Sequence, residues 1–231
     1  AFPILKRTGV PATIFLSTGY ISGVRTFWYD WLCYLCNQPS VRRSGISFAG
    51  RQFPLGENFR LRRENIAVLF AHVKRLPDDL LRQEIAKLES AMGVEYPQEG
   101  FDESHPLTWD QVREMSEAGI EFGSHAVTHP ILTNLTDEQL HQELLVSKQK
   151  IEQEISKPVD VIAYPVGEAF AFSDKVIGAA KSVGYRLGAS YLSGVNEQKL
   201  PNQFELRRLH VERYTSRSDF QGMLAMPGLL A

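Results

Sequence analysis

The second half of the chain alternates between short apolar stretches and longer stretches whose hydrophobic positions follow a helical period. Short apolar runs bounded by turn residues predict buried strands. These runs are residues 120–124, 159–165, 185–190 and 204–211. Because helical patterns with short connections separate them, the alternation predicts an α/β fold whose parallel sheet is covered by helices. The pattern leaves open whether the sheet is doubly wound or closed into a (β/α) barrel.

Capping signals mark where two of the intervening helices begin. Thr108 and Gln111 stand three residues apart, as do Thr136 and Gln139, which is the spacing of a capping box. The first of these helices is predicted to end at Gly119, because glycine favours the position just after a helix.

The N-terminal segment is typical of the end of a helix followed by a strand. Residues 1–7 are amphipathic, Gly9 fits the left-handed position after a helix, and residues 12–17 form a short apolar run. A domain rarely begins in the middle of a helix. We therefore expect a strand upstream of residue 1, so that residues 1–231 form a single domain that is incomplete at its N-terminus.

Residues 22–104 have a different pattern and are predicted to be a largely helical insertion within that domain. An aromatic helix is expected over residues 27–36, a hairpin over residues 45–55, and two amphipathic helices over residues 62–76 and 77–93.

The composition is ordinary for a globular protein and excludes few functions. Of 231 residues, 43% are hydrophobic and 23% are charged, and the formal net charge of −2 gives no electrostatic case for a nucleic-acid partner. No apolar run approaches the roughly 20 residues that span a bilayer, and no export signal is visible. Both the cell envelope and the cytoplasm are compatible with this sequence as locations of the protein. A homodimer is expected if a missing first strand exposes sheet edges.

Cys33 and Cys36 have a C-x-x-C spacing that can indicate zinc or a redox dithiol. A structural zinc site needs a second pair of Cys or His ligands, and none is nearby. We expect two buried thiols on one face of the predicted helix, beside Trp28, Trp31 and Leu32.

His125 and His129 carry the main chemical signal. Four-residue spacing places both rings on one side of a helix or tight turn, which suits one divalent ion. His125 follows the strand predicted over residues 120–124, and parallel sheets gather functional groups at the carboxyl ends of their strands. Spacing alone leaves a solvated turn as the alternative. A metal site would also need at least a third ligand.

Three stretches together resemble the polysaccharide deacetylases, the NodB-like enzymes of carbohydrate esterase family 4, in a Tyr-Pro-x-Gly branch common in bacterial exopolysaccharide clusters. The stretch FPILKRTGVPATIFLSTGYI resembles the segment after the family's first motif. The stretch LTWDQVREMSEAGIEFGSHAVTHPILTNLT contains the His-x-x-x-His-Pro motif, and VIAYPVGEAFAFSD resembles the third motif. The resemblance covers residues 1–22 and about 106–211.

This resemblance implies a distorted (β/α) barrel that removes N-acetyl groups from an amino-sugar polysaccharide or oligosaccharide. One divalent ion, usually zinc, would be held by His125, His129 and an aspartate, and would polarise the acetyl carbonyl and activate a water. The backbone N–H of Val166 would help to hold the oxyanion. A second aspartate would be the general base. His210 is the candidate general acid, with a strand histidine that faces solvent or packs on a neighbour as the alternative.

Other polar and aromatic residues lie near the same predicted edge of the sheet. Tyr164 and Pro165 are candidates for a sugar subsite, because aromatic faces suit apolar sugar surfaces, and turn packing is the alternative. Nearby charged residues are interpreted as solvated or structural; they are Glu168, Asp174, Arg207 and Arg208.

The sequence departs from the family pattern at three places. The family's paired aspartates lie upstream of a segment like residues 1–7, so we expect the metal aspartate and the base before Ala1 and predict that this chain alone is inactive or nearly so. Ala126 stands where other members have serine or threonine, and Ala163 where many have the arginine that orients the base. The alternative function is a non-catalytic carbohydrate-binding or scaffold protein on the same fold. An Asp-Asp pair in the preceding roughly 20 residues would favour the enzyme.

Overall fold

The structure is a computed structural model that describes residues 1–23, 27–96, 106–197 and 202–227. The chain divides into two compact units. The sheet unit consists of residues 1–19 and 109–231, and the helical unit consists of residues 20–108.

The sheet unit is built on a five-stranded sheet in which every neighbouring pair of strands is parallel. In sheet order the strands are β1 (Thr13–Leu16), β4 (Glu121–Ser124), β5 (Val161–Ala163), β6 (Leu187–Ser193) and β7 (Leu206–Arg208). The order follows the chain, as in successive strands of a (β/α) barrel. The predicted α/β fold with a parallel sheet is therefore confirmed, and all five carboxyl ends lie at one edge.

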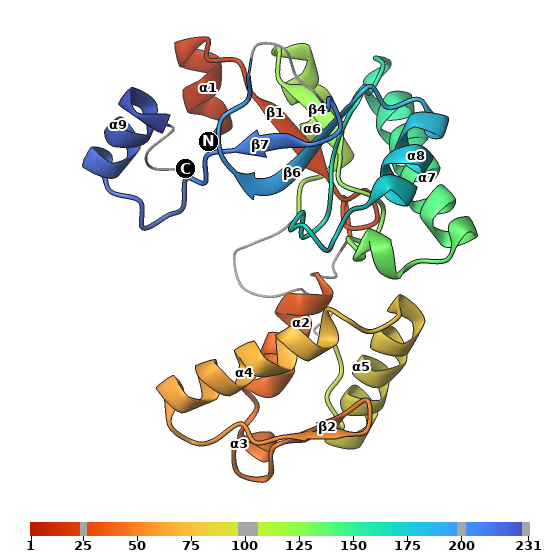
Figure 1. Cartoon of the computed structure of the whole chain (residues 1–231), viewed down its shortest axis with the longest axis vertical. Coiled ribbons are helices and arrows are strands. Elements are labelled where there is room, and N and C mark those ends of the chain that lie inside the picture. Colours follow the sequence, from red (N-terminus) through yellow and green to blue (C-terminus); the bar gives the residue numbers. More distant parts are fainter. Residues whose placement is uncertain (24–26, 97–105, 198–201, 228–231) are drawn as a thin grey trace. The chain divides into compact units, whose positions relative to one another are not determined.

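The sheet unit also contains helices, which alternate with most of its strands along the chain as the sequence pattern predicts. They are α1 (Phe2–Thr8), α6 (Trp109–Glu117), α7 (Asp137–Ile155), α8 (Asp174–Val183) and α9 (Arg217–Ala225), with a short 3-10 turn η1 (Leu132–Asn134). The long helix α7 packs against α6, α8 and β4 (Figure 1). It begins with the predicted capping box between Thr136 and Gln139. Gly9 ends α1 with a φ of 65°, also as predicted.

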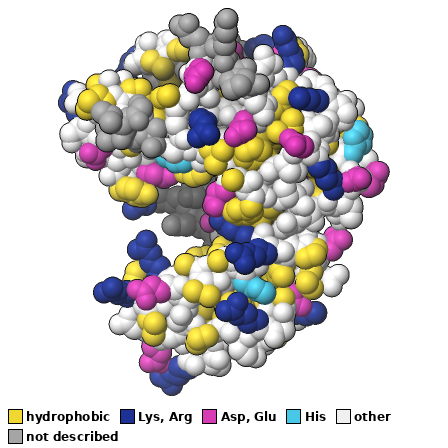
Figure 2. All heavy atoms as spheres, viewed as in Figure 1, with side chains coloured by type: hydrophobic (Ala, Val, Ile, Leu, Met, Phe, Trp, Pro, Cys, Tyr) yellow, Lys and Arg dark blue, Asp and Glu magenta, His cyan; other side chains and the backbone are white. Residues whose placement is uncertain are grey.

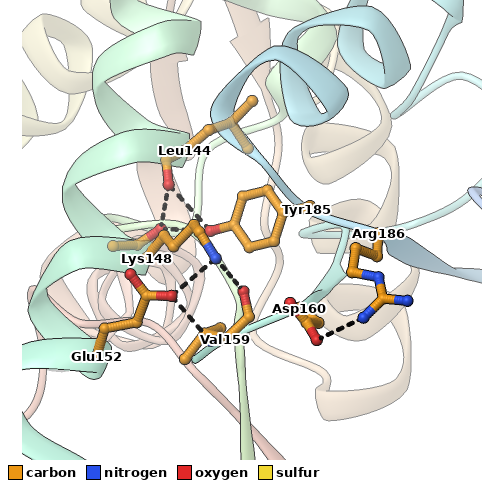
Figure 3. Close-up of polar contacts among 8 residues, drawn as sticks. Leu144, Lys148, Glu152, Val159, Asp160, Tyr185 and Arg186 are labelled. Atoms are coloured by element: carbon orange, nitrogen blue, oxygen red, sulfur yellow. Dashed lines mark hydrogen bonds and ion pairs between the residues drawn. The ribbon is translucent and has the colours of Figure 1, made fainter. Parts of the chain in front are cut away.

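A polar network ties α7 to the amino ends of β5 and β6 (Figure 3). The Lys148 ammonium donates to the Glu152 carboxylate at 2.8 Å and to the carbonyl of Val159. The Val159 N–H donates to the same carboxylate at 2.9 Å. The Tyr185 hydroxyl donates to the Leu144 carbonyl at 2.9 Å. These contacts satisfy buried polar groups and fix where the two strands start, and hence where their carboxyl ends lie.

The helical unit has its own hydrophobic core and contains the expected hairpin and helices. Its elements are α2 (Trp28–Cys36), α3 (Pro39–Ser44), β2 (Ile46–Phe48), β3 (Arg51–Phe53), α4 (Phe59–Val73) and α5 (Asp78–Met92). Fully buried Leu35, Phe48 and Leu69 lie at the centre of the core. Helix α4 begins earlier than predicted, because the Asn58 side chain caps it by accepting from the Arg60 N–H at 2.9 Å.

The two cysteines differ in their surroundings. Cys36 is fully buried, as expected, whereas Cys33 is only half-buried, and both are free thiols. Burial raises the pKa of Cys36 to about 12, so this thiol stays protonated and unreactive at neutral pH. The prediction of two buried thiols is therefore correct for Cys36 alone.

Acidic and basic side chains are interspersed on the molecular face in Figure 2. In the described ranges, no helix combines the length and the apolar character needed to cross a membrane.

Candidate functional site

His125 and His129 lie in the loop that leaves β4 at the carboxyl end of the sheet. The His125 N–H donates to the Leu16 carbonyl at 2.8 Å and so extends the ladder between β1 and β4 by one residue. The centroids of the two imidazole rings are 4.7 Å apart, with an interplanar angle of 78°. The two predicted metal ligands are thus in contact at the predicted edge of the sheet.

The His125 ring is oriented by the neighbouring strand. Its Nδ1 lies 2.6 Å from the carbonyl oxygen of Ala163, the last residue of β5. Because a carbonyl oxygen only accepts, Nδ1 must carry the proton, which leaves the lone pair on Nε2. This is the tautomer that a metal-binding histidine needs.

Both rings are held in the neutral form. Loss of solvation lowers the pKa of His125 to about 4, and the positive charge of Arg208 contributes to the same shift. Loss of solvation, and then the neighbouring His125, lower the pKa of His129 to about 3. Neutral imidazole is the form that binds divalent metals, so the site does not have to lose a proton at neutral pH.

The loop that carries the two rings has an unusual backbone. Ala126 has a φ of 62° and His129 a φ of 56°, in the left-handed region that L-residues other than Gly, Asn and Asp rarely adopt. Val166, in the loop after β5, has a φ of 64°. Such strained residues cluster at functional sites, because the surrounding structure must supply the energy that holds them.

Glu143 of α7 supplies much of the support for the histidine loop. Its Oε2 accepts from the Val127 N–H at 2.7 Å and from the Thr128 N–H at 3.0 Å. Its Oε1 accepts from the Thr128 hydroxyl at 2.8 Å. One carboxylate therefore satisfies three donors between His125 and His129. Glu143 is not among the residues that the sequence patterns predict for the site. Its position on α7 could have identified it, because Glu143 lies next to the buried face of the helix, where a charged side chain needs a partner.

The exit of β1 supports the other side of the same loop. The Ser17 hydroxyl donates to the His125 carbonyl at 3.0 Å, and the Gly19 N–H donates to the Val127 carbonyl at 2.9 Å. Ala126 is fully buried, and its N–H donates to the Ser124 hydroxyl at 3.2 Å. Ala126, which stands where other family members have serine or threonine, is thus packed inside the histidine loop.

The loop after β5 presents a backbone donor. Gly167 has a φ of 65°, and an added Cβ would lie 2.7 Å from the Tyr191 nitrogen, so only glycine fits there. The Tyr191 N–H donates to the Gly167 carbonyl at 2.7 Å and anchors this loop to β6. Within the described chain the Val166 N–H has no hydrogen-bond acceptor. The resemblance to the family assigns this N–H to the oxyanion.

The prediction of a sugar subsite at Tyr164 and Pro165 is wrong. Both residues are buried, and Tyr164 is fully so. The Tyr164 ring stacks on Phe172 with centroids 5.0 Å apart, and its hydroxyl donates to the Phe204 carbonyl at 3.0 Å. Its side chain points into the core of the sheet unit, where no sugar face can reach it.

His210 lies beyond the strand that was predicted to contain it. Strand β7 ends at Arg208, so His210 belongs to the segment that leaves the carboxyl edge of the sheet. Its ring stacks on Tyr191 with centroids 3.8 Å apart and an interplanar angle of 12°. The Tyr191 hydroxyl in turn donates to the Glu212 carboxylate at 2.9 Å.

A complete metal site is not assembled from the part of the chain that the structure describes. Those residues contain no group of three or more His, Cys, Asp or Glu side chains placed to hold an ion. The donors that are present are two neutral imidazoles, and one of them has its tautomer fixed. They fit two positions of a tetrahedral zinc site.

Comparison with known proteins identifies the family. A sequence model of the family described as "Polysaccharide deacetylase" matches residues 70–188. YxkH of Bacillus subtilis, whose name assigns it to the polysaccharide deacetylases, is 30% identical over 116 residues. That match covers 50% of this chain and 40% of the relative, so the chain spans well under half of the relative's length.

Two solved structures are similar over about half of the chain. The Streptococcus pyogenes deacetylase PplD, solved with acetate, is 24% identical with a TM-score of 0.47, and the match covers 52% of this chain and 51% of that one. BC0361, a polysaccharide deacetylase from Bacillus cereus, is 28% identical with a TM-score of 0.46, covering 52% and 37%. The family model matches more than half of the length of this chain, and the chain therefore belongs to the polysaccharide deacetylase family.

Proposed function

We propose that this chain carries the histidine half of a metal-dependent site that hydrolyses N-acetyl groups on an amino-sugar polysaccharide. The contact between His125 Nδ1 and the Ala163 carbonyl carries the proposal, because it leaves Nε2 unprotonated beside a second neutral imidazole. Two histidines and a carboxylate are ligands that suit zinc. A zinc ion bound there would polarise the acetyl carbonyl and lower the pKa of a bound water.

We assign the roles of the other groups from the resemblance to the family. The Val166 N–H would donate to the oxygen that becomes negative when the acetyl carbon is attacked. His210 would protonate the leaving amine of the sugar, and its stacking on Tyr191 would keep the ring in place. The products are acetate and a free amino sugar.

We assign the third protein ligand and the general base to groups outside the described residues. The resemblance to the family assigns both roles to an Asp-Asp pair. We therefore expect this 231-residue chain to release acetate far more slowly than a version extended upstream by one strand and its loop. Equal rates from the two versions would contradict this expectation.

Metal content tests the site directly. Each protein would be equilibrated with zinc, separated from free ion by gel filtration and analysed by mass spectrometry of the metal. We expect bound zinc in the upstream-extended protein and its loss when His125→Ala or His129→Ala is made in that protein. His141→Ala is the matched control, because His141 is an exposed residue of α7. Unchanged zinc in both site variants would refute the proposed ligands.

Acetate release separates the enzyme from a binding or scaffold protein. The upstream-extended protein would be incubated with N-acetylated amino-sugar oligosaccharides, and acetate would be measured with and without zinc. Zinc-dependent release that is lost in His125→Ala supports the hydrolase. Binding of the oligosaccharides without release, at full zinc occupancy, would favour the non-catalytic alternative.

A further inference from the structure

Charge is unevenly distributed along the chain, and the helical unit contains a basic stretch. Residues 41–75, which run from α3 through the hairpin to just past the end of α4, hold eight Lys or Arg side chains and two Glu, a net charge of +6. The rest of the chain holds 17 basic and 25 acidic side chains. The overall net charge of −2 therefore conceals a local positive charge that can attract an anionic partner.

The outer face of α4 carries cations together with apolar side chains. The exposed residues at helical spacing on this face are Arg60, Arg63, Glu64, Ala67, Val68 and Ala71. Leu61 borders the same face, and the exposed fraction is 50% for both Leu61 and Val68. On the opposite side of the helix, Leu69 and Val73 are buried in the core of the helical unit. On the helical unit, Figure 2 shows basic side chains next to hydrophobic ones.

Phe59, the first residue of α4, is supported in an exposed position. Its exposed fraction is 72%, and the guanidinium carbon of Arg62 lies 5.9 Å from the centroid of its ring. Arg62 is buried, and its Nε donates to the Asn37 side-chain oxygen at 2.9 Å. Its Nη1 donates to the Gly56 carbonyl at 3.1 Å and to the Glu57 carbonyl at 2.9 Å. An anchored cation thus lies against a large ring whose exposed surface gains free energy if a partner buries it.

Two exposed ion pairs lie beside Phe59. Arg43 of α3 pairs with Glu57, and Arg60 pairs with Glu64 at 3.2 Å. All four side chains are exposed, and pairs of this kind contribute little to stability, so other anions can compete for the arginines. In the part of the chain that the structure describes, no carboxylate forms an ion pair with Arg63.

We propose that these side chains form a docking surface for an anionic membrane. The α4 surface, as we call it, consists of Arg43, Phe59, Arg60, Leu61 and Arg63. Its arginines would pair with anionic lipid headgroups, while Phe59 and Leu61 would enter the boundary between headgroups and acyl chains. A soluble polyanion would use the arginines alone and would leave both apolar side chains in water. The combination of positive charge with exposed apolar side chains therefore favours a lipid surface.

Binding to lipid vesicles tests the α4 surface. The 231-residue chain would be sedimented with vesicles of equal parts phosphatidylglycerol and phosphatidylcholine, and with vesicles of phosphatidylcholine alone, at low and high salt. Arg43→Gln/Arg60→Gln/Arg63→Gln removes the charges. The matched control in the sheet unit also replaces three exposed cations, as Arg7→Gln/Lys181→Gln/Arg186→Gln. Circular dichroism would confirm that each variant is folded.

A second pair of variants tests the apolar contact without changing charge. Phe59→Ser/Leu61→Ser removes the apolar side chains of the α4 surface. Its control, Ile4→Ser/Val146→Ser, replaces two exposed apolar residues of the sheet unit. Alginate, an acidic polysaccharide, would be titrated in parallel as the soluble polyanion.

We expect the parent chain to bind the phosphatidylglycerol vesicles, to bind phosphatidylcholine far more weakly, and to be released as salt rises. The variant without the three arginines should partition at least about tenfold more weakly, and the serine variant at least about threefold more weakly. Both sheet-unit controls should bind as the parent chain does.

Two results would overturn the proposal. Vesicle binding that is absent from the parent chain, or that is equal in the parent chain and the variant without the three arginines, overturns the α4 surface. If the serine variant binds vesicles as tightly as the parent chain, the apolar contact is absent and the membrane assignment is overturned. Alginate binding that depends on the three arginines would then identify an acidic polysaccharide as the partner. None of these measurements depends on zinc or on acetate release, so they are independent of the proposed hydrolysis.

Discussion

The Thr128 hydroxyl donates to the Glu143 carboxylate at 2.8 Å, and this contact joins the loop that carries both candidate metal ligands to the long helix α7. The same carboxylate accepts two backbone N–H groups of the loop. The geometry of the histidine pair therefore depends on a residue that is itself no ligand.

Replacing Glu143 by alanine should loosen the histidine loop. Three donors lose their acceptor, so the free energy of unfolding should fall by about 2 kcal/mol and zinc affinity by about tenfold or more. Glu143→Gln keeps one carbonyl oxygen that can accept from the two N–H groups. This variant should therefore retain most of the stability and most of the zinc affinity. Urea denaturation and a zinc titration measure the effects. Glu138→Ala, a change at an exposed residue of the same helix, is the control. If Glu138→Ala lowers the free energy of unfolding and the zinc affinity as much as Glu143→Ala does, the role assigned to Glu143 is wrong.

Replacing Gly167 by alanine should disturb the loop after β5. The new Cβ would meet the Tyr191 nitrogen at 2.7 Å in a left-handed backbone, so we expect a loss of about 2 kcal/mol in unfolding free energy. Gly178→Ala is the matched change, since Gly178 lies inside α8 with open space around its Cβ position, and it should stabilise the protein by roughly 0.5–1 kcal/mol. Thermal unfolding monitored by circular dichroism compares the two. A similar melting temperature for both variants would contradict the expectation.

Val166→Gly should leave stability unchanged or raise it. Valine at a φ of 64° costs about 1–3 kcal/mol, and this cost offsets or exceeds the backbone entropy that glycine adds to the unfolded chain. The backbone N–H is kept, so acetate release by the upstream-extended protein should also be kept. Val195→Gly, in an exposed stretch without a positive φ, should instead destabilise. Urea denaturation measures the free energy of unfolding of both variants. If Val166→Gly loses more of this free energy than Val195→Gly does, the valine at residue 166 is not strained.

The metal-free protein should lose stability as the pH falls from about 7 towards 4. The folded-state pKa values of His125 and His129, about 4 and about 3, lie below the unfolded value near 6.5. The unfolded chain therefore takes up protons first, so the stabilisation is complete above pH 6.5 and is lost as the pH falls through the folded pKa values. Urea denaturation across this range should show a shallower decline in a His125→Gln/His129→Gln variant. Parallel pH profiles for the parent and this variant would contradict the assignment.

Local patterns were enough to predict the main elements and the histidine pair. The capping box at Thr136, the glycine after α1 and the alternation of apolar runs depend on neighbouring residues, so they can be detected along the sequence. The parallel sheet followed from the alternation, and the place of His125 at its carboxyl edge followed from the sheet. Tyr164 was wrongly assigned to a sugar subsite because the residue type does not reveal whether the side chain at the end of a strand points into the core or towards solvent.

The α/β class and the pairing of His125 with His129 could therefore be predicted, because both arise from spacing along the chain. The groups that support the histidine pair are brought together only when the chain folds. Glu143, the Ala163 carbonyl and Arg208 come from α7, β5 and β7, and meet the site through packing between elements far apart in the sequence. Contacts of that kind depend on how far each strand extends and how each helix lies on the sheet, and no local pattern records either.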